Sequence, residues 1–166
     1  MGLKCTSPFK NLFLKDEQYL KLLSNLRYYL NIEPEFIRSE KEVHSGMIYP
    51  VLGFDDIEVH CNHDTSVDDA INKWNICKKY LDYNDLFIEM YTVNEESARK
   101  FSDLDMYKNK ICFVPFRQQS DCQMTLRPFP EQKEFWEIVN SSAGRTMYLY
   151  DLLDLLSGVR TYRVSV

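Results

Sequence analysis

The chain has 166 residues, of which 45% are hydrophobic and 27% are charged. This length suits a single domain with its own apolar core, so we expect one domain over residues 1–166. Twenty basic and 25 acidic residues give a net charge of −5, which argues against a nucleic-acid partner. The five glycines form no glycine-rich nucleotide loop.

The start of the chain and its cysteines indicate a cytoplasmic protein. Charged residues from Lys10 to Glu17 interrupt any signal peptide, and no apolar run reaches the length of a membrane span. The cysteines are odd in number and lack C-x-x-C spacing: Cys5, Cys61, Cys77, Cys112 and Cys122. We therefore expect five free thiols in a reducing compartment.

The first third of the chain predicts one helix followed by two irregular strands. Leucines at positions 20, 23, 26 and 30 recur with helical spacing, so residues 15–31 are expected to form a helix. "PEFIRS" (34–39) is a short strand candidate, and "SEKEVHSG" (39–46) reads as a loop. "MIYPVLGF" (47–54) contains Pro50, which predicts a broken or edge strand.

The middle of the chain alternates strands and helices. "IEVHC" (57–61) alternates in polarity, so Ile57, Val59 and Cys61 should face the core. The segment 66–81 predicts a helix that begins at a capping-box-like Ser66 and buries a stripe containing Trp74. Further along, "DLFIEMY" and "KICFVPF" are apolar strand candidates, separated by the short helix "NEESARKFSDL".

Residues 117–130 read as a loop, and two helices, "EQKEFWEIVNSS" and "TMYLYDLLDLLSG", close the chain. Apolar strands separated by helices are typical of parallel sheets. We therefore predict an α/β fold with a mostly parallel central sheet, helices on both of its faces, and two C-terminal helices.

The segment "DDIEVHCNHDTS" (55–66) concentrates the reactive side chains. Alternation places Asp56, Glu58 and His60 on one strand face, with His63 just beyond the strand end. A histidine beside carboxylates suits proton transfer, with Glu58 raising the pKa of His60. A solvated strand face followed by a helix cap is the more common structural interpretation of such a pattern.

A metal site in this segment is disfavoured, because a regular strand turns positions 60 and 63 to opposite sides. Two arginines are candidates for binding an anion such as a leaving phosphate. Arg117 follows a predicted buried strand, and Arg145 lies in "SSAGRT", which lacks the Walker pattern. The more common interpretation is a solvated loop for Arg117 and a simple turn between helices for Arg145. Neither a cofactor nor an oligomeric state follows from the sequence.

Several longer blocks together resemble the bacterial DUF1919 family. They are "TSPFKNLFLKDEQYLKLLSNLRYYL", "YPVLGFDDIEVHCNHDTSVDDAINKW", "YNDLFIEM" and "FSDLDMYKNKICF", in matching order over about residues 3–116. The resembling pattern includes Ser7-Pro8, Tyr49-Pro50, Asp56, Glu58, His60, His63 and Trp74. Two departures stand out. The usual N-terminal strand with its Asn-Asn-Cys segment is not present before "MGLKCTSP", and Cys77 and Tyr80 stand where arginines are expected.

The resemblance implies a role in bacterial surface-polysaccharide or glycoconjugate biosynthesis, for which no biochemical activity is established. One interpretation is a sugar transferase that binds a sugar or nucleotide-sugar. His63, Glu58, His60 and Asp56 would then act as catalytic residues, and Arg117 and Arg145 would bind the ligand. The alternative is a non-catalytic binding or scaffold domain, because the departures are those of a degenerate family member.

Overall fold

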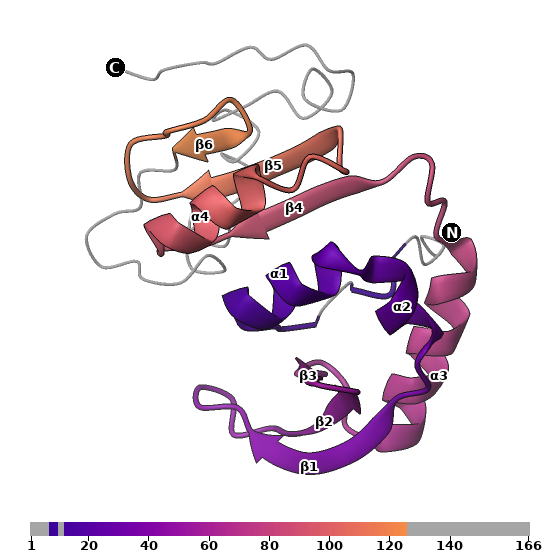
Figure 1. Ribbon diagram of the computed structural model, residues 1–166. Helices are drawn as coiled ribbons and strands as arrows, with labels where there is room; N and C mark the ends of the chain where they lie inside the picture. The colour runs from indigo at the N-terminus through magenta and orange to yellow at the C-terminus, as the bar shows by residue number, and fades with distance from the viewer. Residues whose placement is uncertain (1–6, 10–11, 126–166) are drawn as a thin grey trace, which may run out of the picture. The chain divides into compact units, whose positions relative to one another are not determined.

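The computed structural model describes residues 7–9 and 12–125. These residues belong to two compact units, one ending at Leu86 and the other beginning at Phe87. Each unit has its own three-stranded sheet (Figure 1). The two C-terminal helices predicted from the sequence lie outside the described residues.

The first unit begins with two short helices, α1 (Asp16–Ser24) and α2 (Leu26–Asn31). We expected one continuous helix, but Asn25 leaves the helical conformation (φ −144°, ψ 53°) and separates the two. The predicted leucine stripe is nevertheless correct, since the leucines at positions 20, 23, 26 and 30 are all buried. The break turns the chain without exposing this apolar face.

An antiparallel sheet follows, with the strand order β1-β2-β3. Its strands are β1 (Glu35–Lys41), β2 (Ile48–Phe54) and β3 (Ile57–His60). Contrary to expectation, the Pro50-containing strand β2 is central and buried. The proline is accommodated because it lies beyond the end of β3, where only its carbonyl is needed to accept the Cys61 amide at 3.0 Å.

One face of this sheet forms the apolar core. Cross-strand partners Leu52 and Val59, and Phe54 and Ile57, share that face, and each is at most 1% exposed. Helix α3 (Val67–Cys77) packs here through Trp74, whose ring centroid is 4.4 Å from that of Phe54. As predicted, Ser66 caps α3 by accepting the Asp69 amide. A 3₁₀ turn, η1 (Lys78–Tyr80), ends the segment.

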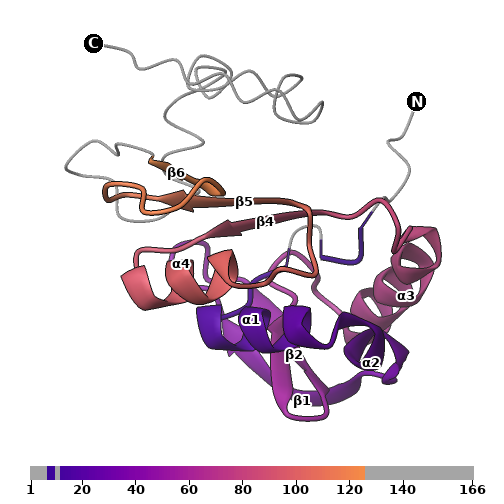
Figure 2. The same ribbon diagram turned by 45° about the horizontal axis from the view of Figure 1, so that its top comes forward.

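The second unit contains the predicted strand–helix–strand succession. Strands β4 (Phe87–Tyr91) and β5 (Asn109–Val114) pair in parallel, and α4 (Glu95–Ser102) connects them. Figure 2 shows α4 lying along one side of these two strands. A short strand that we did not predict, β6 (Gln123–Thr125), pairs in parallel with β5.

The prediction of one mostly parallel central sheet with helices on both faces is therefore wrong. The first sheet is antiparallel and only the second, smaller sheet is parallel. The error arose because buried β2 and β3 are joined by a two-residue turn at Asp55 and Asp56, where Asp55 adopts the left-handed conformation (φ 58°). Such a turn produces a hairpin and thus antiparallel pairing.

The cysteines also depart from expectation. Cys61, Cys112 and Cys122 are free thiols. Cys77 is disulfide-bonded, so the prediction of five free thiols is wrong.

Candidate functional site

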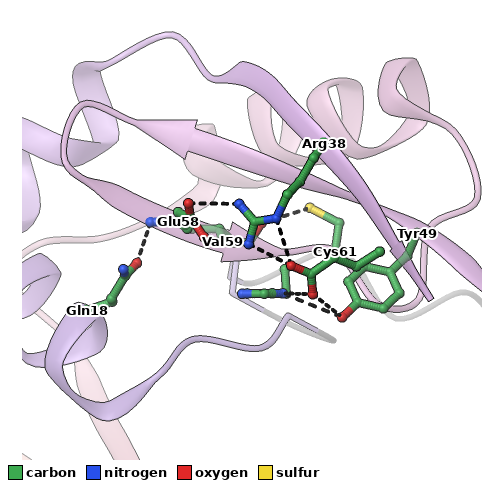
Figure 3. A network of polar contacts seen from close by, with 8 residues as sticks. Gln18, Arg38, Tyr49, Glu58, Val59 and Cys61 are labelled. Atoms are coloured by element: carbon green, nitrogen blue, oxygen red, sulfur yellow. Dashed lines mark hydrogen bonds and ion pairs between the residues drawn. The ribbon is translucent and has the colours of Figure 1, made fainter. Parts of the chain in front are cut away.

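A network of polar side chains lies on the sheet face opposite the apolar core. Its members come from all three strands: Arg38 and Glu40 from β1, Tyr49 from β2, and Glu58 and His60 from β3. Figure 3 shows part of this network, with Arg38 reaching toward Glu58. We call it the β1–β3 network.

The strand register explains why these residues meet. Val51 in β2 lies opposite both Arg38 in β1 and His60 in β3. Directly opposed residues in an antiparallel sheet point to the same face, and so do residues two apart in one strand. Glu40 and Glu58 therefore join the same face as Arg38 and His60. Glu58 lies opposite Gly53, and the side chain of Ile37 packs against this glycine.

Arg38 is the centre of the network. Its two terminal nitrogens donate to the two carboxylate oxygens of Glu58, both at 2.8 Å. Its Nε and Nη2 donate to Oε1 of Glu40 at 2.8 and 2.6 Å. These charge-assisted bonds hold the pKa of both carboxyl groups below its usual value, so Glu40 and Glu58 are ionised at neutral pH.

His60 forms the buried end of the network, with a side chain only 6% exposed. Its Nδ1 lies 3.3 Å from Oε2 of Glu40 and 3.5 Å from the hydroxyl of Tyr49. The ring also makes an edge contact with Phe13, 5.4 Å between centroids. Burial lowers the pKa of His60, and this outweighs the opposing effect of Glu40 and Glu58. Glu58 does raise the pKa of His60, as expected, but burial lowers that pKa by more.

Asp56 does not join Glu58 and His60. It occupies the β2–β3 turn, where it forms an ion pair with Lys21 and accepts a hydrogen bond from the Tyr29 hydroxyl at 2.8 Å. Desolvation and this hydrogen bond raise the pKa of Tyr29 to about 12. Of the three residues predicted to share one strand face, only Glu58 and His60 do so. Asp56 does not, because the strand, and with it the alternation of side chains, begins only at Ile57.

His63 lies in a tight turn after β3, closed by a hydrogen bond from the Asp64 amide to the Cys61 carbonyl at 2.9 Å. This strand end and the following loop agree with prediction. The His63 side chain is exposed, and no hydrogen bond or ion pair to it is found in the described part of the chain. The neighbouring Asp64 is mostly buried and pairs with Lys73 at 3.2 Å. His63 is therefore the residue of this segment whose polar atoms are open to a ligand.

The two candidate anion-binding arginines lie elsewhere. Arg117 is an exposed residue of the loop after β5, in the second unit. Arg145 lies outside the described residues. Within residues 7–9 and 12–125, no group of three or more histidine, cysteine, aspartate or glutamate side chains is arranged to hold a metal ion.

Sequence reasoning missed Arg38, Glu40 and Tyr49. A signal was available in "RSE", in which Arg38 and Glu40 occupy alternate positions of a strand, as Glu58 and His60 do in β3. Charged residues at alternate positions in two strands of one sheet can form cross-strand ion pairs. Recognising the pair required knowing that β1 and β3 flank the same central strand.

Comparison with known proteins gives a family and no activity. The chain is 29% identical over 153 residues to an uncharacterized protein of Haemophilus influenzae. The matched region covers 89% of this chain and 70% of that protein. No helix in the described ranges has both the length and the apolar character needed to cross a membrane. The family model described as "Domain of unknown function (DUF1919)" matches residues 1–158, and the chain belongs to this family.

Proposed function

We propose that the β1–β3 network binds a hydroxyl-rich, sugar-like ligand, and that the protein serves bacterial surface-polysaccharide or glycoconjugate assembly. The observation that supports the binding role is the fixed placement of Arg38 between two ionised carboxylates. Glu40 and Glu58 remain 33% and 34% exposed, so their oxygens can be reached from solvent. The polysaccharide setting rests on the family resemblance of the sequence.

The chemistry of the network matches that of a sugar hydroxyl. A hydroxyl both donates and accepts hydrogen bonds, whereas an ionised carboxylate only accepts and a guanidinium only donates. Arg38 offers the hydrogen-bond donor and the carboxylates of Glu40 and Glu58 offer the acceptors, all within one rigid cluster. Because the side chains project from strands and hold one another in place, little conformational entropy would be lost on binding. Phe13, 49% exposed beside His60, adds an apolar surface for the ring of a sugar.

The charge of the network selects among sugar ligands. One guanidinium faces two ionised carboxylates, and His60 is neutral at pH 7 because burial lowers its pKa. The cluster is therefore net negative, which disfavours a phosphate group at this position. A neutral saccharide or an amino sugar fits better than the diphosphate of a nucleotide-sugar. A nucleotide-sugar would have to place its phosphates away from this cluster.

Sugar transfer is the second candidate function, and the exposure of His63 favours it. Transfer requires a group that accepts the proton of an attacking hydroxyl. Glu58 suits this role less well, since Arg38 lowers its pKa and weakens it as a base. Asp56 is likewise occupied by Lys21 and Tyr29. In a transferase, His63 would act as the base while Glu58 and Glu40 orient the acceptor.

Isothermal titration with neutral oligosaccharides, amino sugars and nucleotide-sugars tests the binding role. We expect a neutral or amino sugar to bind the wild type and to bind at least tenfold more weakly to Arg38→Gln. The matched control is Arg99→Gln, because Arg99 belongs to the second unit and forms its exposed ion pair there, with Asp103. Absence of binding by every saccharide, or equal affinity of Arg38→Gln and wild type, would refute the proposal.

A second measurement separates transfer from binding alone. Release of nucleotide from a donor sugar is followed in the presence of the acceptor that binds. A transferase should lose this release in His63→Ala while keeping its affinity for the acceptor. Binding without release in the wild type would identify a non-catalytic binding domain.

A further inference from the structure

The two edges of the antiparallel sheet differ in how they are protected. At the β3 edge, the backbone amide and carbonyl of His60 bond to Phe13, both at 2.9 Å, and the Glu58 amide donates to the side chain of Gln18. At the β1 edge, no strand in the described ranges pairs with the outer side. An edge strand with unpaired backbone groups is a template for the pairing of another strand.

The hydrogen bonds of His60 determine which β1 residues present their backbone at this open edge. Because His60 bonds outward to Phe13, its partner Val51 directs its own amide and carbonyl toward β1. Arg38 lies opposite Val51 and therefore directs its backbone inward, toward β2. Successive residues alternate, so Ser39 and Lys41 present their amides and carbonyls outward. Ser39 is exposed at the middle of this open stretch.

The side chains around Ser39 are complementary to themselves. If a second β1 strand pairs antiparallel with a two-fold axis at Ser39, Arg38 of each copy lies opposite Glu40 of the other. Opposite charges across neighbouring strands stabilise a pair, and like charges destabilise it. A two-fold axis at Arg38 would instead oppose two arginines. The pattern Arg38-Ser39-Glu40 thus fits a second copy of this chain in one register.

We propose that two copies of the chain pair through the outer edges of their β1 strands, with the two-fold axis at Ser39. The arrangement is symmetric, as expected of a dimer in which the same surface serves both partners. It joins two β1–β3 sheets into one and continues the β1–β3 network across the interface. Ile37 and Phe36, 44% and 50% exposed, lie at the ends of the paired stretch.

The bulge in β1 limits the extent of this pairing. The register with β2 shifts between Phe36 and Arg38, so the strand bends at Ile37. A regular ladder with a second copy, symmetric about Ser39, therefore spans Arg38 to Glu40 on each strand. Bulges and charges on an edge also discourage pairing with unrelated strands. The bulge at Ile37 and the charges of Arg38 and Glu40 thus favour the register with the two-fold axis at Ser39.

Sedimentation velocity of the full chain over a range of concentrations tests the proposal. The wild type should form dimers as the concentration rises, and Ser39→Pro should remain monomeric. Proline removes the outward amide of Ser39 but no hydrogen bond to β2, so the fold should survive, as a circular dichroism spectrum can show. Ser39→Ala keeps the amide and should dimerise like the wild type. A wild type that is monomeric throughout, or a folded Ser39→Pro variant that dimerises equally, would overturn the proposal.

Cysteine cross-linking tests the register independently of the proline variant. Residues on the two-fold axis of an antiparallel pair lie about 5.5 Å apart between Cα atoms, within reach of a disulfide. Ser39→Cys should therefore form a disulfide-linked dimer under mild oxidation. Lys41→Cys, two residues away on the same strand, should not link to itself. Wild type under the same conditions controls for the partly exposed Cys122. Equal cross-linking of both variants would contradict the register.

Discussion

Each unit of the chain contains a polar cluster, and the two clusters differ in charge and exposure. In the first unit, Arg38 joins two carboxylates that are each about one third exposed. In the second unit, the cluster is formed by neutral side chains: the hydroxyls of Ser102 and Ser120 lie 2.8 Å apart, and the amide of Gln123 donates to Ser102 Oγ at 3.1 Å. Only the first cluster offers charge to the solvent.

This difference separates a cluster that can exchange partners from one that holds the fold together. Gln123 is 3% exposed and satisfies its side chain within the unit, since it also donates to the Ala98 carbonyl at 3.3 Å and accepts the Gln119 amide at 2.9 Å. These bonds tie β6 to α4. The β1–β3 network instead leaves carboxylate surface accessible. The contrast supports the proposal that the charged cluster binds a ligand, whereas the bonds of the neutral cluster hold the second unit together.

Replacing Gln123 with alanine should give the largest loss of stability among the changes that test this comparison. The substitution removes the buried link between β6 and α4 and leaves the Gln119 amide without its acceptor. Each unsatisfied buried polar group costs about 1–3 kcal/mol, so the free energy of unfolding should fall by about that amount. Urea unfolding measured by circular dichroism supplies this value.

The nearby Gln118→Ala variant is the control, because Gln118 is exposed and its hydrogen bond to the Thr125 hydroxyl uses the backbone amide, which the substitution keeps. Its effect should stay within about 0.5 kcal/mol. Equal losses for Gln118→Ala and Gln123→Ala would show that the neutral cluster does not hold β6 in place.

His60 should make the stability of the first unit depend on pH in a range above that in which the carboxylates titrate. Burial lowers the pKa of His60 in the folded state below its ordinary value of 6.5. As the pH falls through 6.5, the unfolded chain takes up the proton first, so the folded state loses stability on acidification. Its neighbours Glu40 and Glu58, whose pKa is also lowered, lose their contribution only below their ordinary value of 4.5. The interval from pH 7.5 to 5.5 therefore isolates His60.

His60→Gln should reduce the decline in the free energy of unfolding between pH 7.5 and 5.5, whereas the exposed control His63→Gln should leave it unchanged. Unfolding in urea at several pH values provides the comparison. A decline of the same size in His60→Gln and wild type would mean that another group causes it.

Local patterns predicted the elements near the site well. The alternation of "IEVHC" identified β3 and the burial of Ile57 and Val59, and the cap at Ser66 identified the start of α3. The leucine spacing identified the buried face of α1 and α2. These features depend on residues a few positions apart, which the sequence shows directly.

Features that depend on strand pairing could not be predicted in the same way. The burial of His60 requires Tyr49 from β2 and Phe13 from before α1, and no pattern within β3 reveals either. The partnership of Arg38 with Glu58 spans two strands and depends on the bulge in β1. The prediction of parallel pairing was wrong for a similar reason, because the strands of a buried hairpin and those of a parallel sheet have the same apolar composition.

Salt should produce the smallest effect, and it should distinguish the two clusters because only one of them is charged. At 1 M salt the screening length falls to about 3 Å, comparable to the 2.6–2.8 Å bonds between Arg38 and its carboxylates. Direct contacts at this distance are only partly screened, so the stability difference between wild type and Arg38→Gln should shrink without vanishing. The difference for Gln123→Ala involves neutral groups and should stay constant. Parallel urea unfolding in 0.05 M and 1 M sodium chloride measures both differences. If the Gln123→Ala difference shrinks as much as that of Arg38→Gln, salt is acting on the whole fold and the contrast between a charged and a neutral cluster fails.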